Sequence, residues 1–147
     1  MGDTAFLELA LEQAHIGRSE GGIPIGAALV AFDRVLGVGR NRRVQLGSVI
    51  RHGEMDALEN AGRHGADVYR RSTMYTTLSP CHMCSGAILL YGIPRVVIGE
   101  NRTFLGAEEL LQNQGVEVVD LDSEECVRLM ESFIAENPEL WEEDIGV

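Results

Sequence analysis

Two short motifs contain residue types that bind a transition metal. The first is His52-Gly53-Glu54, and the second, Pro80-Cys81-His82-Met83-Cys84, places two cysteines three positions apart. Zinc prefers thiolate and imidazole ligands, and a catalytic zinc site has three protein ligands and leaves its fourth position to water. His52, Cys81 and Cys84 are therefore the candidate ligands of a catalytic zinc ion.

Glu54 is the candidate catalytic acid and base, because it follows His52 by two positions and is not needed as a ligand. Zinc lowers the pKa of a bound water from about 16 to about 7, so a nearby carboxylate can take a proton near neutrality. We expect Glu54 to accept that proton and later to deliver it to a departing group. This is the chemistry of a metal-assisted hydrolysis.

Two other interpretations of these motifs compete with a catalytic site. A structural zinc site needs a fourth protein ligand. None of the other soft donors lies at a spacing that completes such a site; they are His15, His64, His82 and Cys126. A redox pair of cysteines would leave the His-x-Glu motif without a role. We therefore favour catalytic zinc.

The elements that must position these residues alternate between helices and strands. Hydrophobic spacing predicts helices over 3–17, 52–61, 81–91, 107–113 and 124–135, and strands over 25–32, 35–41, 73–78, 96–98 and 116–119. Asp3 is expected to cap the first helix. Both cysteines of the second motif lie at a helix start, where the helix dipole favours the thiolate. This order predicts an α/β fold with helices on both faces of a central sheet, and the initial hairpin makes that sheet mixed.

The size and charge of the chain limit its partners. Its 147 residues suit one domain, 1–147. The 12 basic and 23 acidic side chains give a net charge of -11, which repels a phosphate backbone. We interpret the arginines at 40, 42 and 43, and at 70 and 71, as solvated or subunit-interface residues rather than a phosphate-binding patch. The sequence therefore predicts no nucleic-acid partner.

No segment has the pattern of a secretion signal or a membrane span. The N-terminus lacks the basic start and apolar core of a secretory signal. The longest apolar stretch, 86–99, is interrupted by Pro94 and Arg95 and is too short to cross a bilayer. Three cysteines, an odd number, favour metal chemistry over a disulfide framework. We expect a cytoplasmic protein with no membrane partner.

Several segments around the zinc motifs resemble the yeast-type cytosine deaminases. That family belongs to the zinc-dependent cytidine/deoxycytidylate deaminase superfamily, whose signature combines H-x-E with P-C-x-x-C. The resemblance runs from about Ala10 to the C-terminus, and its most similar stretches are 52–54, 76–81, 91–95, 99–101 and 141–146. It implies a three-layer α/β/α cytidine-deaminase-like fold with a central mixed five-stranded sheet. It also implies a homodimer with one Zn2+ per subunit, and hydrolytic deamination of a free nucleobase, with conversion of cytosine to uracil plus ammonia as the leading reaction.

The resemblance also implies roles for residues outside the zinc motifs. Asn41 and Asp144 are expected to contact the edge of the base, and Phe104 and Trp141 to form aromatic walls, with residues 137–147 acting as a C-terminal lid. The remaining implied contacts are pocket-lining side chains at Ile23 and Leu78, a backbone carbonyl beside the leaving amine at Ser79, and a backbone N–H for the ring carbonyl at Gly53.

Two departures from the family pattern leave the finer substrate preference open. Glu142 stands where the pattern has an aromatic residue, and Arg102-Thr103 beside Phe104 also differ. Isocytosine, another aminopyrimidine or triazine, and guanine are the alternative substrates. Editing of adenosine in tRNA is less favoured because of the acidic net charge and the lid. A non-catalytic zinc protein is also less favoured, because Glu54 is present and one zinc position is open.

Overall fold

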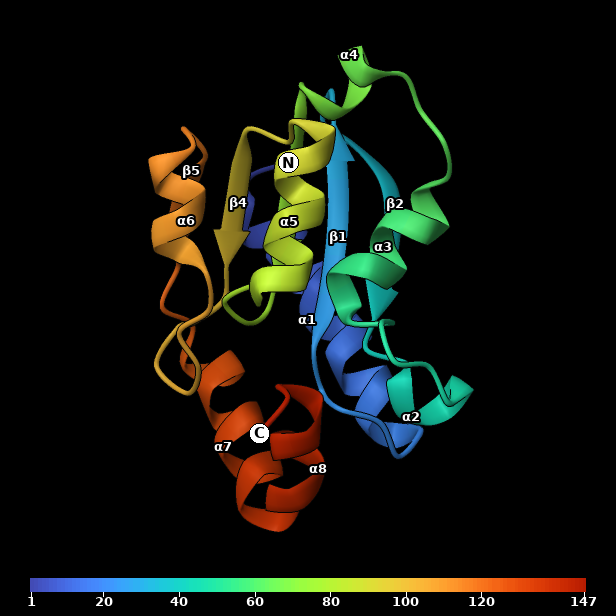
Figure 1. Ribbon diagram of the computed structural model, residues 1–147, viewed down its shortest axis with the longest axis vertical. Helices are drawn as coiled ribbons and strands as arrows, with labels where there is room; N and C mark the ends of the chain where they lie inside the picture. The colour runs from blue at the N-terminus through green and yellow to red at the C-terminus, as the bar shows by residue number, and fades with distance from the viewer.

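Five strands form one mixed sheet, in the order β2-β1-β3-β4-β5 (Figure 1). The structure is a computed structural model that describes residues 1–147. The strands are β1 (Gly26–Ala31), β2 (Arg34–Arg40), β3 (Ser72–Thr76), β4 (Arg95–Ile98) and β5 (Glu117–Asp120). β1 pairs antiparallel with β2 and β3, whereas β3 with β4 and β4 with β5 are parallel. The predicted mixed five-stranded sheet is confirmed.

Every helix expected from the hydrophobic spacing is present, with ends shifted by a few residues at most. The helices are α1 (Asp3–Ser19), α2 (Arg43–Leu46), α3 (Gly53–Ala61), α4 (Ala66–Tyr69), α5 (His82–Tyr91), α6 (Glu108–Asn113), α7 (Glu124–Glu136) and α8 (Pro138–Asp144). The short helices α2 and α4 were not predicted, because four residues are too few to show a helical hydrophobic period. No helix combines the length and the apolar character needed to cross a membrane.

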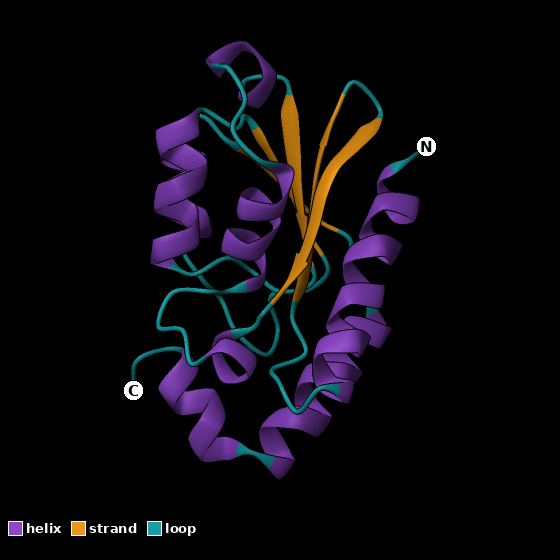
Figure 2. Cartoon of the chain, turned by 90° about the vertical axis from the view of Figure 1, so that its right-hand side faces the viewer, coloured by secondary structure: helices purple, strands orange, loops and turns teal.

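Helices cover both faces of the sheet, which gives the expected three layers (Figure 2). Side chains alternate along each strand, so Ala27 and Leu29 face one layer while Ala28 and Val30 face the other. On the first face α3, α5 and α6 contribute buried side chains to one apolar cluster with the sheet. On the second face α1 packs on the sheet through Phe6 and its neighbours, and its far end packs on α7.

One detail of the first helix differs from the prediction. The N-cap of α1 is Gly2, with no side-chain cap, and the Asp3 carboxylate instead accepts hydrogen bonds from the Arg95 guanidinium at 2.8 and 2.7 Å and from the Tyr75 hydroxyl at 2.7 Å. The hydrogen bonds from Arg95 lower the pKa of Asp3 to about 2. A partner 92 residues away in the chain outcompetes the local cap, so Asp3 ties α1 to β3 and β4.

Three strands deliver the candidate site residues to the same edge of the sheet. β2 and β3 both run antiparallel to β1 and are therefore parallel to each other, and β4 is parallel to β3. Their carboxyl ends consequently meet, and open α/β sheets bind ligands at such an edge. The segments that follow these ends are 41–52, 77–81 and 99–106.

Candidate active site

Two helix N-termini bring the three expected metal ligands together. His52 is the N-cap of α3 and Cys81 the N-cap of α5, with Cys84 buried in the first turn of α5. The Nδ1 atom of His52 lies 3.4 Å from Cys81 Sγ and 3.7 Å from Cys84 Sγ. In a tetrahedral zinc site with Zn–S and Zn–N bonds of usual length, nitrogen and sulfur ligands lie about 3.6 Å apart. The spacing and the donor types of this cluster therefore fit zinc.

The charges within the cluster also suit a divalent cation. The hydrogen bond from Cys84, together with His52, outweighs burial and lowers the pKa of Cys81 to about 4. Burial alone would lower the pKa of His52, but hydrogen bonds to Asp144 and Cys81 raise it to about 10. The site thus stabilises a thiolate beside a protonated imidazole. A bound metal takes the place of such protons.

The second ring nitrogen of His52 is held from the opposite side by Asp144. His52 Nε2 lies 3.2 Å from the backbone carbonyl oxygen of Asp144 and 3.5 Å from its Oδ1. Metal-binding histidines commonly donate their other ring N–H to a carbonyl or carboxylate, which fixes the ring orientation. Asp144 therefore directs Nδ1 of His52 toward the two sulfur atoms.

Glu54 lies in the first turn of α3, beside the metal cluster, and is 4% exposed. Burial raises its pKa to about 7. A carboxyl group that titrates near neutrality can both take and give a proton during one reaction cycle. The position of Glu54 therefore combines a proton carrier with an adjacent metal site.

A cavity lies next to the cluster, between the sheet edge and α8. The rings of Phe104 and Trp141 meet edge to face across it, with centroids 5.7 Å apart. The lining residues are Ile25, His52, Glu54, Leu78, Ser79, Cys81, Phe104, Trp141, Asp144 and Ile145. Ten residues from five segments far apart in the sequence thus surround one small space, and His52, Cys81 and Glu54 form part of its wall.

Comparison with known proteins agrees with this geometry. Residues 1–100 match the cytidine and deoxycytidylate deaminase zinc-binding region. The chain belongs to this family. It is therefore a zinc-dependent deaminase, and His52, Cys81 and Cys84 are positioned to hold the metal ion.

The family relatives differ in the molecules they are named for. The chain is 58% identical to the cytosine deaminase of Candida albicans over 145 residues, which cover 98% of this chain and 97% of that protein. It is 35% identical to a tRNA-specific adenosine deaminase of Streptococcus pyogenes over 146 residues, which cover 92% of each.

Solved structures share the fold of this deaminase. A structure from studies of A-to-I editing at the wobble position of transfer RNA aligns with a TM-score of 0.72 and 28% identity, over 86% of this chain and 99% of that chain. A guanine deaminase from Nitrosomonas europaea aligns with a TM-score of 0.72 and 22% identity, over 89% and 84% of the two chains. At 22% identity, the second match shows the fold alone.

The deaminase places the other expected site residues at or beside the cavity, with one exception. Asn41 is fully buried, and its Nδ2 donates to both carboxylate oxygens of Asp144, at 3.1 and 3.3 Å. Gly53 lies against Ile25 and Asn41, where a Cβ atom would come within 3.1 Å of the Ile25 carbonyl. Ile23 does not line the cavity and instead lies beneath it in the apolar cluster that contains Trp141. Ile25, two residues later, occupies the wall position.

Hydrogen bonds fix Ser79 on the cavity wall. Its Oγ donates to Glu108 Oε2 at 2.5 Å and accepts from the Gly106 N–H at 2.9 Å. Its own N–H donates to the Glu100 carbonyl at 3.0 Å. These contacts set the direction of the Ser79 carbonyl. No sequence motif pointed to Glu108, because its partner is 29 residues away.

The arginines at 40, 42 and 43 pair with carboxylates of the same chain, which corrects their interpretation as solvated residues. Arg40 pairs with Glu20 at 2.9 Å, and Arg42 pairs with Asp56 at 2.8 Å. The Arg43 guanidinium donates two hydrogen bonds to the Glu143 carboxylate, at 2.7 and 2.8 Å, a bidentate ion pair called here the Arg43–Glu143 fork. Arg43 also donates to Asp144 Oδ1 at 3.2 Å. These contacts join the 41–52 segment to α8. Each guanidinium is matched by a carboxylate of the same chain, so the cluster offers no unpaired patch to an external phosphate.

Proposed function

We propose that this deaminase hydrolyses a free pyrimidine base, converting cytosine to uracil and ammonia. The observation that carries the proposal is a cavity lined by Glu54, Asp144 and two of the metal ligands, His52 and Cys81, together with the rings of Phe104 and Trp141. Identity of 58% to a cytosine deaminase over nearly the full length of both chains supports the same substrate. A flat base suits a slot between apolar walls, with a few polar groups that fix its orientation.

Glu54 carries the proton through the reaction. Zinc supplies a water of lowered pKa. With a pKa near 7, the Glu54 carboxylate can take one proton of the water and pass it to the ring nitrogen. It can then take the second proton from the hydroxyl group now attached to the ring carbon and deliver it to the departing amine. In the balance of the reaction a C–O bond to water forms, the C–N bond to the amino group breaks, and ammonia leaves. The buried position of Glu54 keeps bulk water from competing for the proton.

The polar residues of the cavity hold the edge of the base. Asn41 Nδ2 donates to both Asp144 oxygens, and its amide has two hydrogens, so one can share the carboxylate while the other serves a ring acceptor. The Asp144 carboxylate can accept from a ring or amino N–H. In this proposal the Ser79 carbonyl accepts a hydrogen bond from the leaving amine, and the Gly53 N–H donates one to the ring carbonyl. Leu78, Phe104 and Trp141 form the apolar walls, with Ile23 supporting them from below.

A second candidate is the deamination of adenosine in tRNA, which the Streptococcus pyogenes relative favours. Two observations weigh against it. Trp141, Asp144 and Ile145, from the α8 segment, form part of the cavity wall, so a polynucleotide has no path out while α8 is in place. The net charge is -11, and the arginines nearest the site are paired.

The substrate is tested by ammonia release from cytosine, isocytosine, guanine, adenine and cytidine at equal concentrations. We expect cytosine to be turned over fastest. The alternative substrates are isocytosine, another aminopyrimidine or triazine, and guanine. Faster turnover of one of these would leave the zinc mechanism unchanged but would mean that Asn41 and Asp144 recognise the edge of a different base. Deamination of a tRNA anticodon stem in place of cytosine would overturn the proposal.

The proposal includes a single domain whose residues 137–147 form the lid, assembled as a homodimer with one zinc per subunit. The α5 helix supports the dimer, because its ten residues include no Lys, Arg, Asp or Glu, and Leu90 and Tyr91 are 75% and 45% exposed. Exposed apolar faces of this kind commonly mark subunit contacts. The three unpaired cysteines fit a reducing compartment, and we retain a cytoplasmic location as part of the proposal. Sedimentation equilibrium measures the oligomeric state directly.

A further inference from the structure

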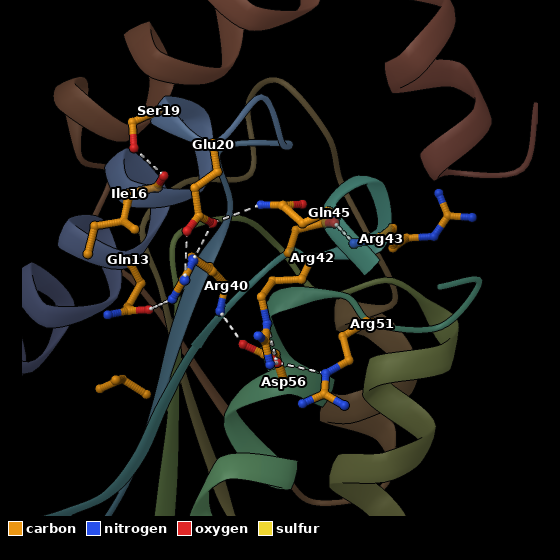
Figure 3. Close-up of polar contacts among 12 residues, drawn as sticks. Gln13, Ile16, Ser19, Glu20, Arg40, Arg42, Arg43, Gln45, Arg51 and Asp56 are labelled. Atoms are coloured by element: carbon orange, nitrogen blue, oxygen red, sulfur yellow. Dashed lines mark hydrogen bonds and ion pairs between the residues drawn. The ribbon is translucent and has the colours of Figure 1, made fainter. Parts of the chain in front are cut away.

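A fully buried carboxylate on α3 gathers donors from four separate positions in the chain. Asp56 is 0% exposed and accepts from the Arg40 N–H at 2.9 Å, from Arg42 at 3.0 and 2.8 Å, and from Arg51 Nε at 2.7 Å. Asn60 adds a longer contact at 3.4 Å. Figure 3 shows Arg42 and Arg51 converging on this carboxylate from one side and the end of β2 from another. The Asp56 backbone N–H donates to the His52 carbonyl at 2.9 Å, whereas its carboxylate contacts neither the cavity lining nor the metal-binding atoms.

The donors of Asp56 lie at the two ends of the segment that carries the site. Arg42 directly follows Asn41, and Arg51 directly precedes His52. The two ends also meet through the backbone, because the Arg42 N–H donates to the Arg51 carbonyl at 3.0 Å. One carboxylate thus bridges Arg42 and Arg51, the neighbours of the residue assigned to the base edge and of the histidine assigned to the metal.

Few apolar contacts hold this segment in place, and polar contacts such as the Arg43–Glu143 pair do most of that work. It contains only the four-residue helix α2, none of whose residues is buried. Leu46, Val49 and Ile50 are 54%, 77% and 52% exposed, so their side chains contribute little to the core. A segment with few buried apolar contacts is free to open locally unless polar contacts restrain it. The position of its ends must therefore come mainly from hydrogen bonds and ion pairs.

We propose that Asp56 is a positioning residue that sets the placement of Asn41 relative to His52, and through them aligns the base with the metal. The inference rests on the proposed function for the role of Asn41, whereas its effect on His52 needs only the metal site. Replacing Asp56 with asparagine keeps the shape of the side chain but removes its charge, leaving two adjacent guanidinium groups without their anion. Their mutual repulsion would separate Arg42 from Arg51 and loosen both ends of the segment.

A purely structural role predicts a different outcome, and a matched variant separates the two. Asp3 also binds an arginine through two short hydrogen bonds, at 2.8 and 2.7 Å. Its partner Arg95 begins β4, whereas the site lies beyond the other end of that strand. Asp3→Asn therefore breaks a comparable ion pair without touching the site, and it controls for the general cost of losing such a pair.

The experiment measures zinc affinity by chelator competition, and KM and kcat for cytosine, in Asp56→Asn and Asp3→Asn. Groups that orient metal ligands typically affect metal affinity or activity by about 10- to 100-fold. We expect Asp56→Asn to weaken zinc binding on the order of 10-fold and to raise KM in the zinc-loaded enzyme. Asp3→Asn should change neither quantity, although both variants melt at lower temperature. Equal zinc affinity and KM in the two variants would overturn the proposal.

A milder pair of variants guards against failure of Asp56→Asn to fold. Arg51→Gln removes one partner and leaves the Arg42–Asp56 pair, and Arg51→Lys restores the positive charge. We expect weaker zinc binding in Arg51→Gln and partial recovery in Arg51→Lys. Wild-type zinc affinity in a folded Arg51→Gln variant would overturn the role of Asp56. If the wild-type enzyme proves inactive on cytosine while Asp56→Asn still loses zinc affinity, the proposed function fails and the positioning role stands.

Discussion

The contact between Arg43 and Glu143 should set how often the C-terminal lid opens. Trp141, Asp144 and Ile145 wall the cavity, and in the proposed function this segment is the lid that moves when a base enters or leaves. The Arg43–Glu143 fork joins the body to α8. The Glu143 side chain is 60% exposed, so solvent screening keeps the stabilisation from this pair small. Glu143→Gln should therefore raise the open fraction about two- to fivefold.

Trp141 reports this motion because it is the only tryptophan in the chain and lies within the lid, packed against Phe104. Acrylamide quenching of its fluorescence measures opening, and stopped-flow fluorescence measures uracil release. We expect both to increase about two- to fivefold in Glu143→Gln. Equilibrium affinity for the ligand should stay near the wild-type value, because the fork is present in the closed state with and without ligand.

Glu142→Gln is the matched control. Glu142 is exposed, lies next to Glu143 in α8, and is not among the partners of Arg43. It removes the same charge from the same helix without breaking the fork. Identical quenching and release rates in Glu143→Gln and Glu142→Gln would refute the reasoning.

Three further predictions concern the metal, the acid stability and the leaving group. Removing zinc should abolish turnover and lower Tm by about 5–10 °C, measured by calorimetry before and after zinc is restored; an unchanged Tm would argue against a metal that joins α3 to α5. The Asp3 carboxyl has a folded-state pKa of about 2, below its ordinary 3.8, so its contribution of about 2 kcal/mol is present above pH 4 and is lost as the pH falls toward 2. Urea titrations should show Asp3→Asn to be less stable than wild type at pH 7, with the gap closing at pH 2–3; a constant gap would contradict this linkage. Glu108→Ala removes the hydrogen-bond acceptor of the Ser79 hydroxyl and should lower kcat about 10-fold with zinc content unchanged. A wild-type kcat in the zinc-loaded variant would show that Glu108 does not position Ser79.

Local patterns predicted most of the fold. Alternation along β1 and helical spacing along α1 depend on neighbouring residues alone, and the spacing of Cys81 and Cys84 placed both in or beside the first turn of α5. The short helices α2 and α4 carry no such period. Asp3 has the residue type and position of a helix cap, and the prediction was wrong because its actual partner, Arg95, is remote in the sequence.

The parts of the site that were not predicted depend on long-range pairing. Arg42 pairs with Asp56, 14 residues away in the sequence, and Arg43 pairs with Glu143, 100 residues away. No local sequence pattern predicts either pair. Ile25 rather than Ile23 lines the cavity because the geometry at the start of β1, not the apolar character that both share, decides which side chain faces it. Residue types therefore predicted the chemistry of the site, whereas its supporting contacts are determined by tertiary packing.

The most direct test of the central claim compares wild-type enzyme with Glu54→Gln at equal, measured zinc content, following ammonia release from cytosine. Glutamine keeps the size of the buried side chain but cannot carry the proton. We predict rapid release by the wild type and loss of turnover by a factor of about 100 or more in the variant, with one zinc bound to each subunit of both. Comparable turnover in the zinc-loaded variant would contradict the role of Glu54 and the mechanism built on it.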